Sequence, residues 1–198
     1  MKIVVTGFGE FNDIKDNISS YIVKHLDTKS FDLIKISDVE VSYDCVKLLA
    51  NSIRNEIKPD IVIHFGVSTK ANDIELEIMS HNSFYDEKDV KGLYCNETFK
   101  CVDHAEEILT TNLNVIKVVN TYEKENEDDF GLVLSDDPGC FLCAFIYYLS
   151  LFLDPNRNVL FIHLPNISDE NRKKILLNNV QKILEIIIKN FKKRFFMN

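Results

Sequence analysis

Short apolar segments recur along the chain, and several end at glycine, histidine or proline. Residues 60–66 (DIVIHFG) are apolar without alternation, which is typical of a strand buried on both faces. Residues 74–79 alternate apolar with polar positions, which favours a half-exposed strand. The segments predicted to be strands are residues 2–6, 31–41, 60–66, 74–79, 130–134 and 159–163.

Between these strands lie segments in which apolar residues recur at helical spacing. We predict helices over residues 17–26, 43–57, 105–109, 115–122 and 138–152, and a last helix with the apolar stripe Ile175, Val180, Ile183, Ile187 and Phe191. Ser168 is expected to cap that last helix, with Asp169 and Glu170 in its first turn. Residues 82–101 show no clear period and are predicted to form a loop.

Strands and helices alternate through most of the chain. This order predicts an α/β fold with a mostly parallel central sheet between helical layers. No internal repeat, low-complexity linker or composition shift divides the sequence. We therefore expect a single domain over residues 1–198, a length that suits one compact unit.

Composition narrows the possible partners. The formal net charge of -8 argues against a general nucleic-acid or anionic-membrane surface. No apolar segment reaches the roughly 18 residues of a membrane span. The first residues lack the apolar region of a secretory signal, and the 5 cysteines are an odd number. We therefore expect free thiols in a reducing, cytoplasmic compartment.

The ends of the predicted strands carry the candidate chemistry, because open α/β sheets bind ligands at the carboxyl ends of their strands. His163 ends the last predicted strand, and Cys140 and Cys143 follow the strand over residues 130–134. Asp137 and Pro138 suit the start of a helix that would place Cys143 one to two turns in. A thiol near a helix start and a histidine are the parts of a cysteine nucleophile with its base.

Other interpretations of the same residues stay open on spacing alone. Cysteine is among the most buried residue types, so each thiol could be packing in an apolar helix. The C-x-x-C pair could be a redox site, and Cys95 with Cys101 offers a poor zinc spacing. His64 follows apolar residues and resembles a hydrogen-bonded strand-end histidine. Glu75 and Glu77 share one strand face, which is usually solvated.

A series of short motifs runs through the chain in a specific order and separation. They are Thr6-Gly7-Phe8 with Phe11 and Asn17, residues 58–68 (KPDIVIHFGVS), residues 76–82, residues 139–143 (GCFLC), residues 147–151, and residues 161–165 (FIHLP). On these residues the sequence resembles the pyroglutamyl peptidase type I (pyrrolidone-carboxylate peptidase) family of cysteine peptidases. His81-Asn82 and Tyr147-Tyr148 look more like animal members than bacterial ones.

The resemblance implies a role for each motif. It implies a single-domain three-layer α/β/α sandwich that hydrolyses the amide bond after an N-terminal pyroglutamyl residue of peptides, with no metal or cofactor. The implied catalytic residues are Cys143 as nucleophile, His163 as its base, and Glu77 to orient His163. The implied substrate-binding residues are Phe8, Phe11 and Phe141 around the ring, and backbone near Val67 at its polar edge. Backbone N–H groups at the start of the Cys143 helix would meet the oxyanion.

Five positions depart from the family pattern: Glu10, Asn12, Glu75, Ile78 and Ala144. They leave every member of the implied triad in place, and they motivate a second hypothesis of a weak or inactive member that binds capped peptide N-termini. A third hypothesis is a thiol redox protein that uses the C-x-x-C pair. The family pattern leaves the choice between a monomer and a homo-oligomer undetermined.

Overall fold

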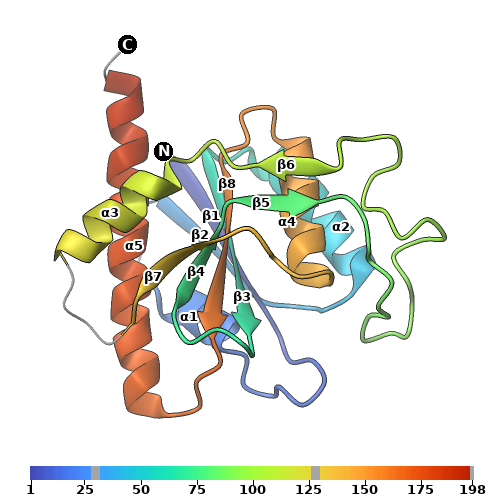
Figure 1. The fold of residues 1–198 in the computed structure, drawn as a ribbon, viewed down its shortest axis with the longest axis horizontal. Coiled ribbons are helices and arrows are strands. Elements are labelled where there is room, and N and C mark those ends of the chain that lie inside the picture. Colours follow the sequence, from blue (N-terminus) through green and yellow to red (C-terminus); the bar gives the residue numbers. More distant parts are fainter. Residues whose placement is uncertain (28–31, 126–129, 197–198) are drawn as a thin grey trace.

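A six-stranded sheet forms the centre of the molecule, for which a computed structural model describes residues 1–27, 32–125 and 130–196 (Figure 1). Its strand order is β2-β1-β3-β8-β4-β7. The bounds of these strands are Lys2–Phe8 (β1), Asp32–Val39 (β2), Ile61–Ser68 (β3), Ile74–Glu77 (β4), Leu132–Ser135 (β7) and Val159–Pro165 (β8). The strand predicted over residues 31–41 begins at a residue, Phe31, that lies outside the described ones.

The sheet is mostly parallel, as predicted, and it reverses direction at β4. Strands β2, β1, β3 and β8 pair in parallel, whereas β4 is antiparallel to β8 and parallel to β7. Strand β8, the last along the chain, lies between β3 and β4 with all of its residues buried. It therefore joins the two parts of the sheet.

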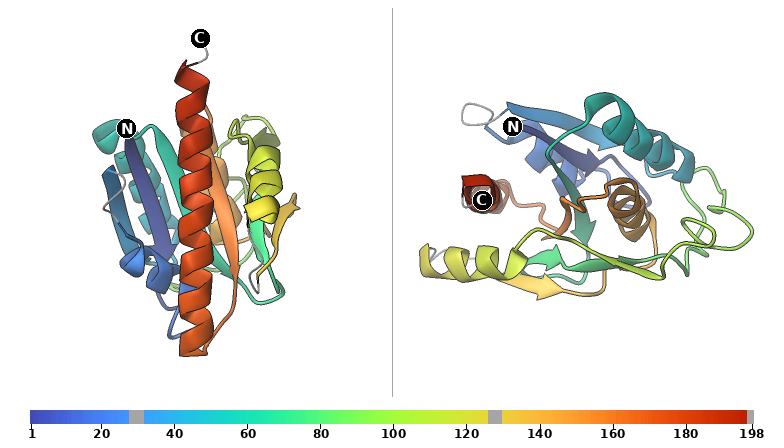
Figure 2. Two further views of the ribbon diagram at one scale, coloured as in Figure 1. Left: turned by 90° about the vertical axis from the view of Figure 1, so that its left-hand side faces the viewer. Right: turned by 90° about the horizontal axis from the view of Figure 1, so that it is seen from above.

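Helices cover both faces of the sheet, which confirms the predicted α/β/α arrangement (Figure 2). The helices are α1 (Ile18–His25), α2 (Tyr43–Ser52, followed by a π-helical turn at Ile53–Ile57), α3 (Val115–Glu125), α4 (Leu142–Leu153) and α5 (Glu170–Phe196). Helices α1, α3 and α5 pack on one face, and α2 and α4 pack on the other. No helix in the described part of the chain is long and apolar enough to cross a membrane.

Two hydrophobic clusters, one on each face, fill the space between sheet and helices. Successive residues of β8 alternate between them: Leu160 and Ile162 join the cluster under α1 and α5, while Val159 and Phe161 join the cluster under α4. The stripe predicted for the last helix faces the first cluster, with Val180, Ile183, Ile187 and Phe191 buried and Ile175 partly buried. Both faces of the sheet are therefore packed.

Three local predictions were wrong. The helix predicted over residues 105–109 is instead the approach to a strand, β6 (Ile108–Thr110), which pairs antiparallel with β5 (Met79–His81) in a separate two-stranded sheet. Strand β4 is not half-exposed, because β7 and β8 flank it and Ile74, Leu76 and Glu77 are all buried. Asp169, rather than Ser168, caps α5, since its carboxylate accepts the N–H groups of Asn171 and Arg172.

Candidate active site

A buried histidine and a buried glutamate form the centre of the candidate site. His163 on β8 is 6% exposed and Glu77 on β4 is 0% exposed. Nδ1 of His163 lies 2.7 Å from Oε1 of Glu77. The antiparallel pairing of β4 with β8 sets Glu75 directly opposite His163, so Glu77 reaches the ring from the same strand face. The expectation that this glutamate face is solvated was wrong.

The thiol of Cys143 lies on the other side of the same imidazole. Cys143 shares a hydrogen bond with His163, whose Nδ1 is taken by Glu77. Its sulfur also lies close above Gly66 on β3, the residue opposite His163 in the β3–β8 pair. A Cβ atom at Gly66 would come within 2.9 Å of this sulfur, so the site requires glycine there. Thus β3, β4, β8 and the start of α4 converge on one point.

The electrostatics of this cluster favour a protonated His163. Burial by itself lowers the pKa of His163, but hydrogen bonds with Cys143 and Glu77, together with the attraction of both groups, outweigh it and raise the pKa to about 10. An imidazolium between a sulfur and a carboxylate is the arrangement that activates a cysteine nucleophile. The cluster can therefore supply both a nucleophile and an acid.

The carboxylate of Glu77 depends on that positive charge. Its second oxygen, Oε2, is buried and has no hydrogen-bond partner among the described residues. A buried carboxylate oxygen without a partner is costly, which makes attraction to His163 its main compensation. Glu75 adds a second carboxylate, and ligand atoms of Glu75, Glu77 and His163 all lie within 4.8 Å of one another. Burial and the charge of Glu77 raise the pKa of Glu75.

The helix that carries Cys143 begins later than the sequence suggested. Helix α4 starts at Leu142 with Phe141 as its N-cap, so Cys143 is its second residue. Asp137 and Pro138 lie outside it, because Gly139 takes a left-handed conformation (φ 77°) that interrupts helical geometry. Phe141 offers no side-chain capping hydrogen bond, so the first N–H groups of α4 remain available around the thiol.

Two buried hydroxyl groups tie α4 to the strands beside it. The Ser80 hydroxyl on β5 donates to the Ala144 carbonyl in the first turn of α4, at 2.8 Å. The Tyr147 hydroxyl on α4 donates to the Glu77 carbonyl, also at 2.8 Å. As predicted, α4 is buried along most of its length. These contacts fix the backbone on both sides of the thiol and the carboxylate.

Three aromatic residues belong to the same hydrophobic cluster as Cys143. Phe8 is buried, while Phe11, Phe141 and Cys143 are partly buried members of the same hydrophobic cluster. The partly exposed members can contact a ligand without unfolding the core. Val67, by contrast, turns its side chain to the cluster on the opposite face. Strand β3 continues past its last pair with β1, which joins Gly7 to Phe65. Because the Val67 side chain faces the other way, only the backbone near Val67 can reach these aromatic residues.

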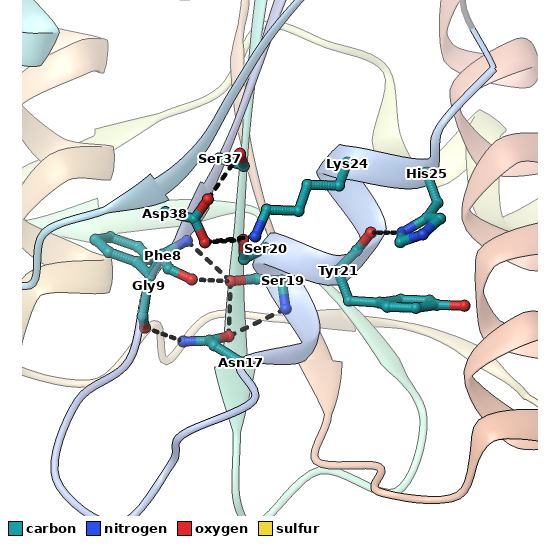
Figure 3. Close-up of polar contacts among 10 residues, drawn as sticks. All are labelled: Phe8, Gly9, Asn17, Ser19, Ser20, Tyr21, Lys24, His25, Ser37 and Asp38. Atoms are coloured by element: carbon teal, nitrogen blue, oxygen red, sulfur yellow. Dashed lines mark hydrogen bonds and ion pairs between the residues drawn. The ribbon is translucent and has the colours of Figure 1, made fainter.

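The turn after β1 is held in place by the start of α1, as Figure 3 shows. The Phe8 N–H donates to the Ser19 hydroxyl at 2.9 Å, and the Asn17 amide donates to the Gly9 carbonyl at 2.9 Å. The Asn17 side chain also caps α1 by accepting the Ser19 N–H. The backbone from which Phe8 projects is thus fixed before any ligand binds.

The remaining histidine and cysteine candidates have structural partners. His64 is fully buried between the hydroxyls of Thr6 (2.7 Å) and Ser150 (2.9 Å), and burial lowers its pKa to about 3. It is hydrogen-bonded as predicted, but it lies inside β3 rather than at the end of the strand. Cys95 contacts the Tyr85 carbonyl and Cys101 the Phe145 carbonyl, and burial raises the pKa of both thiols. Their sulfurs contact backbone oxygens, which is the behaviour of packed thiols.

Comparison with known proteins identifies the family. The family model described as pyroglutamyl peptidase matches residues 1–192. The chain belongs to the pyroglutamyl peptidase family. The resemblance inferred from the short motifs is thereby confirmed, and membership makes the chain a cysteine peptidase. Human pyroglutamyl-peptidase 1 is 32% identical over 174 residues, covering 82% of this chain and 78% of the relative.

A relative from Pyrococcus furiosus is also similar. Pyrrolidone-carboxylate peptidase from Pyrococcus furiosus is 30% identical over 190 residues, covering 88% of this chain and 86% of the relative. A crystal structure of the pyrrolidone carboxyl peptidase of that organism superposes with a TM-score of 0.84 at 23% identity, covering 96% of this chain and 100% of the other. This similarity confirms the predicted α/β fold.

Sequence reasoning missed several residues that shape the site. Gly66, Ser80 and Tyr147 act through close approach or through bonds to distant backbone, and only Gly66 carried a readable signal, as a glycine ending an apolar strand. Among the predicted residues, the structure brings Cys143, His163 and Glu77 together, and it places Phe8, Phe11 and Phe141 in the hydrophobic cluster that Cys143 joins.

Proposed function

We propose that this chain removes N-terminal pyroglutamate from peptides through an acyl-enzyme on Cys143. The observation that carries the proposal is the position of His163, which is buried and bonded to Cys143 on one side and to Glu77 on the other. Family membership supports the substrate class, because human pyroglutamyl-peptidase 1 is named for it.

Recognition of the substrate would use the aromatic residues of the cluster that Cys143 joins. A pyroglutamyl ring is a neutral lactam without a free amine, so it suits an apolar site with a few backbone hydrogen bonds. Phe11 and Phe141, which are partly exposed, would contact the ring faces, and buried Phe8 would support them from within the same cluster. Backbone near Val67, where β3 extends past β1, would meet the polar edge of the lactam.

The first half of the reaction forms a thioester. The Cys143 sulfur attacks the pyroglutamyl carbonyl carbon, and the oxygen of the tetrahedral intermediate is met by N–H groups at the uncapped start of α4. His163 gives its proton to the leaving amine as the carbon–nitrogen bond breaks. Glu77 keeps the imidazole oriented and balances its charge, as the aspartate does in a serine-protease triad.

The second half returns the enzyme to its starting state. Neutral His163 takes a proton from water, and the resulting hydroxide attacks the thioester carbon. The carbon–sulfur bond breaks, pyroglutamate leaves, and the sulfur shares the proton of His163 again. Because the first half needs the protonated ring, turnover falls as pH rises through the pKa of about 10.

The test is release of a fluorescent amine from a pyroglutamyl amide. We expect the wild-type chain to turn over, Cys143→Ala to show no turnover, and Cys140→Ala, the matched control, to keep most of it. Mass spectrometry of quenched reactions should show one pyroglutamyl group on Cys143. Well-folded wild-type protein without turnover, or full turnover by Cys143→Ala, would contradict the proposal.

The two rival hypotheses predict different results. A non-catalytic binder of capped peptide N-termini would bind a pyroglutamyl peptide without an acyl-enzyme burst. A redox protein would form a reversible disulfide between Cys140 and Cys143 under mild oxidation. The two sulfurs have different partners, since that of Cys140 lies 3.8 Å from Glu87 whereas that of Cys143 lies at Gly66. These different contacts favour hydrolysis over a disulfide between the two cysteines.

We also propose a cytoplasmic location, because all 5 cysteines are free thiols and such thiols persist in a reducing compartment. Labelling with a membrane-impermeant thiol reagent, before and after cell lysis, checks this. Labelling of intact cells at full yield would contradict it.

A further inference from the structure

His81 makes a pair of contacts that only a charged ring can satisfy. Its Nδ1 lies 2.7 Å from the Ser83 carbonyl oxygen, and its Nε2 lies 2.7 Å from the Gly139 carbonyl oxygen. A carbonyl oxygen only accepts hydrogen bonds, so both ring nitrogens must donate. A neutral imidazole has one N–H, and the imidazolium has two. The observed contacts therefore belong to protonated His81.

The ring is fixed by its surroundings. The Tyr85 ring stacks on it, with centroids 5.5 Å apart and an interplanar angle of 19°. The Tyr85 hydroxyl donates to the His81 carbonyl, and Tyr85 is fully buried with its edge against Phe145 of α4. His81 is therefore attached to the same helix that carries Cys143, and it has little freedom to turn away from Gly139.

The contact at Gly139 lies four residues before the nucleophile. Gly139 uses both of its backbone groups, since its N–H donates to the Asp137 carboxylate at 3.1 Å and its carbonyl accepts from His81. Its left-handed conformation turns the chain into the N-cap of α4. The segment from Gly139 to Cys143 supplies the N–H groups assigned to the oxyanion. The position of these N–H groups thus depends on the hydrogen bond between His81 and the Gly139 carbonyl.

We propose that protonated His81 is a positioning residue, which holds the Gly139 turn against β5 so that the backbone N–H groups before Cys143 face the substrate carbonyl. This rests on the proposed function, because it concerns the same reaction. When the ring loses a proton, one of the two contacts becomes a nitrogen lone pair facing a carbonyl oxygen at 2.7 Å, which is repulsive. Ser83 is only two residues from His81 in the chain, so the Ser83 contact is kept. The contact with the Gly139 carbonyl is the one that is lost, and the Gly139 turn is no longer held.

Charged groups around His81 enter the same equilibrium. Glu107, which precedes β6, attracts the charged ring and is itself paired with Lys100 and bonded to the Ser83 hydroxyl at 2.8 Å. On the α4 side, Asp137 binds Gly139 and Glu87 contacts Cys140. Three carboxylates and one lysine thus lie around His81 and the Gly139 turn.

The experiment compares pH profiles of kcat for four forms of the full chain. Besides the final loss at His163, we expect wild-type kcat to fall by roughly tenfold when His81 loses its proton, because one charge-assisted hydrogen bond is lost. A glutamine side chain can donate to only one of the two carbonyls, so His81→Gln should show the lowered kcat at every pH. His81→Lys, which stays charged, should restore the higher kcat and remove the step. His25 is an exposed histidine on α1 (Figure 3), and His25→Gln is the control that should match wild type.

A positioning role also predicts which constants change. His81→Gln should lower kcat with KM changed less than threefold, and iodoacetamide should alkylate Cys143 at the wild-type rate, because His163 and Glu77 are untouched. A His81→Gln profile identical to wild type overturns the proposal. So does a failure of His81→Lys to raise kcat above that of His81→Gln.

Nuclear magnetic resonance of the wild-type chain decides the matter without variants or turnover. The amides of residues 139–142 should shift in the same pH steps in which the His81 ring nitrogens change from imidazolium to neutral imidazole. Amides that keep their positions through that change overturn the proposal. If the wild-type chain cleaves no pyroglutamyl amide, the proposed function fails. This titration still tests the contact between His81 and Gly139 separately.

Discussion

Gly66 is the residue whose lack of a side chain lets the thiol and the imidazole meet. It lies opposite His163 in the β3–β8 pair, and a Cβ atom there would come 2.6 Å from the Phe161 ring and 2.9 Å from the Cys143 sulfur. Carbon and its non-bonded neighbours ordinarily stay about 3.5 Å or more apart. A single methyl group at this position must therefore move the sulfur, the ring or both.

We predict that Gly66→Ala lowers kcat on the order of a hundredfold, because a displacement of the reacting group by a fraction of an ångström up to 1 Å has that cost. Steady-state kinetics on a pyroglutamyl amide measure it. Gly9→Ala is the matched control, since a Cβ atom there meets only the Asp38 backbone at 3.4 Å, an ordinary contact. Equal loss in both variants would show that close approach at Gly66 is not what sets the rate.

The catalytic candidates differ in how far the sequence alone could predict them. Cys143 and His163 were candidates from residue type and position, because a thiol beside a helix start and a strand-end histidine are recognisable chemistry. Glu77 came only from the family resemblance. Its alternating strand reads as half-solvated, and its burial depends on β7 and β8 flanking β4, which no local pattern records.

Element boundaries near the site follow backbone conformation and capping rather than composition. Asp137 and Pro138 have the residue types of a helix start, yet α4 begins at Leu142 because the left-handed Gly139 intervenes. At α5, the Asp169 carboxylate accepts two N–H groups, at 3.1 and 2.9 Å. In each case, neighbouring residues had similar propensities, so the choice between them depends on geometry.

We predict that Asp169→Ala lowers the free energy of unfolding by about 1 kcal/mol, the usual cost of losing an N-cap. Ser168→Ala, one residue earlier, should change it by less than about 0.5 kcal/mol, as is normal for a surface substitution without such a role. Urea titrations of both variants, followed by circular dichroism, compare them directly. A larger loss in Ser168→Ala would place the cap where the sequence had suggested it.

Strand direction was the main feature of the sheet that the sequence left unresolved. Alternating strands and helices predict parallel pairing, and β1, β2, β3 and β8 obey it. Strand β4 follows β3 without an intervening helix, and it returns antiparallel to β8. The end of β7 and Phe161 of β8 both pair with the same residue of β4, so β7 ends level with Phe161 and not at the carboxyl end of β8. Residues 136–141 then carry the chain back to the thiol.

At the scale of the whole molecule, one sheet supports two hydrophobic clusters. Alternate residues of β8 belong to opposite clusters, so this one strand contributes to the core on both faces. The single domain predicted over residues 1–198 therefore should behave as one cooperative unit. Such behaviour is usual for small single domains.

We predict that Ile183→Ala on α5 and Ile146→Ala on α4 each lower the free energy of unfolding by about 2–5 kcal/mol, the usual cost of truncating a buried isoleucine. Both residues are 0% exposed, one on each face. Far-ultraviolet circular dichroism and tyrosine fluorescence should give one coincident transition in each variant. Leu48→Ala, at a side chain 73% exposed, is the control. Two separate transitions would contradict a single domain.

The central place of β8 has a consequence for synthesis on the ribosome. Strands β1, β2 and β3, and later β4, β7 and the thiol of α4, all emerge before the strand that lies between them. A nascent chain that has not yet reached residue 159 lacks both the joining strand and His163. The cluster of thiol, imidazole and carboxylate can therefore be complete only after residue 163 has been synthesised, and a translation product that ends earlier carries a thiol without its histidine.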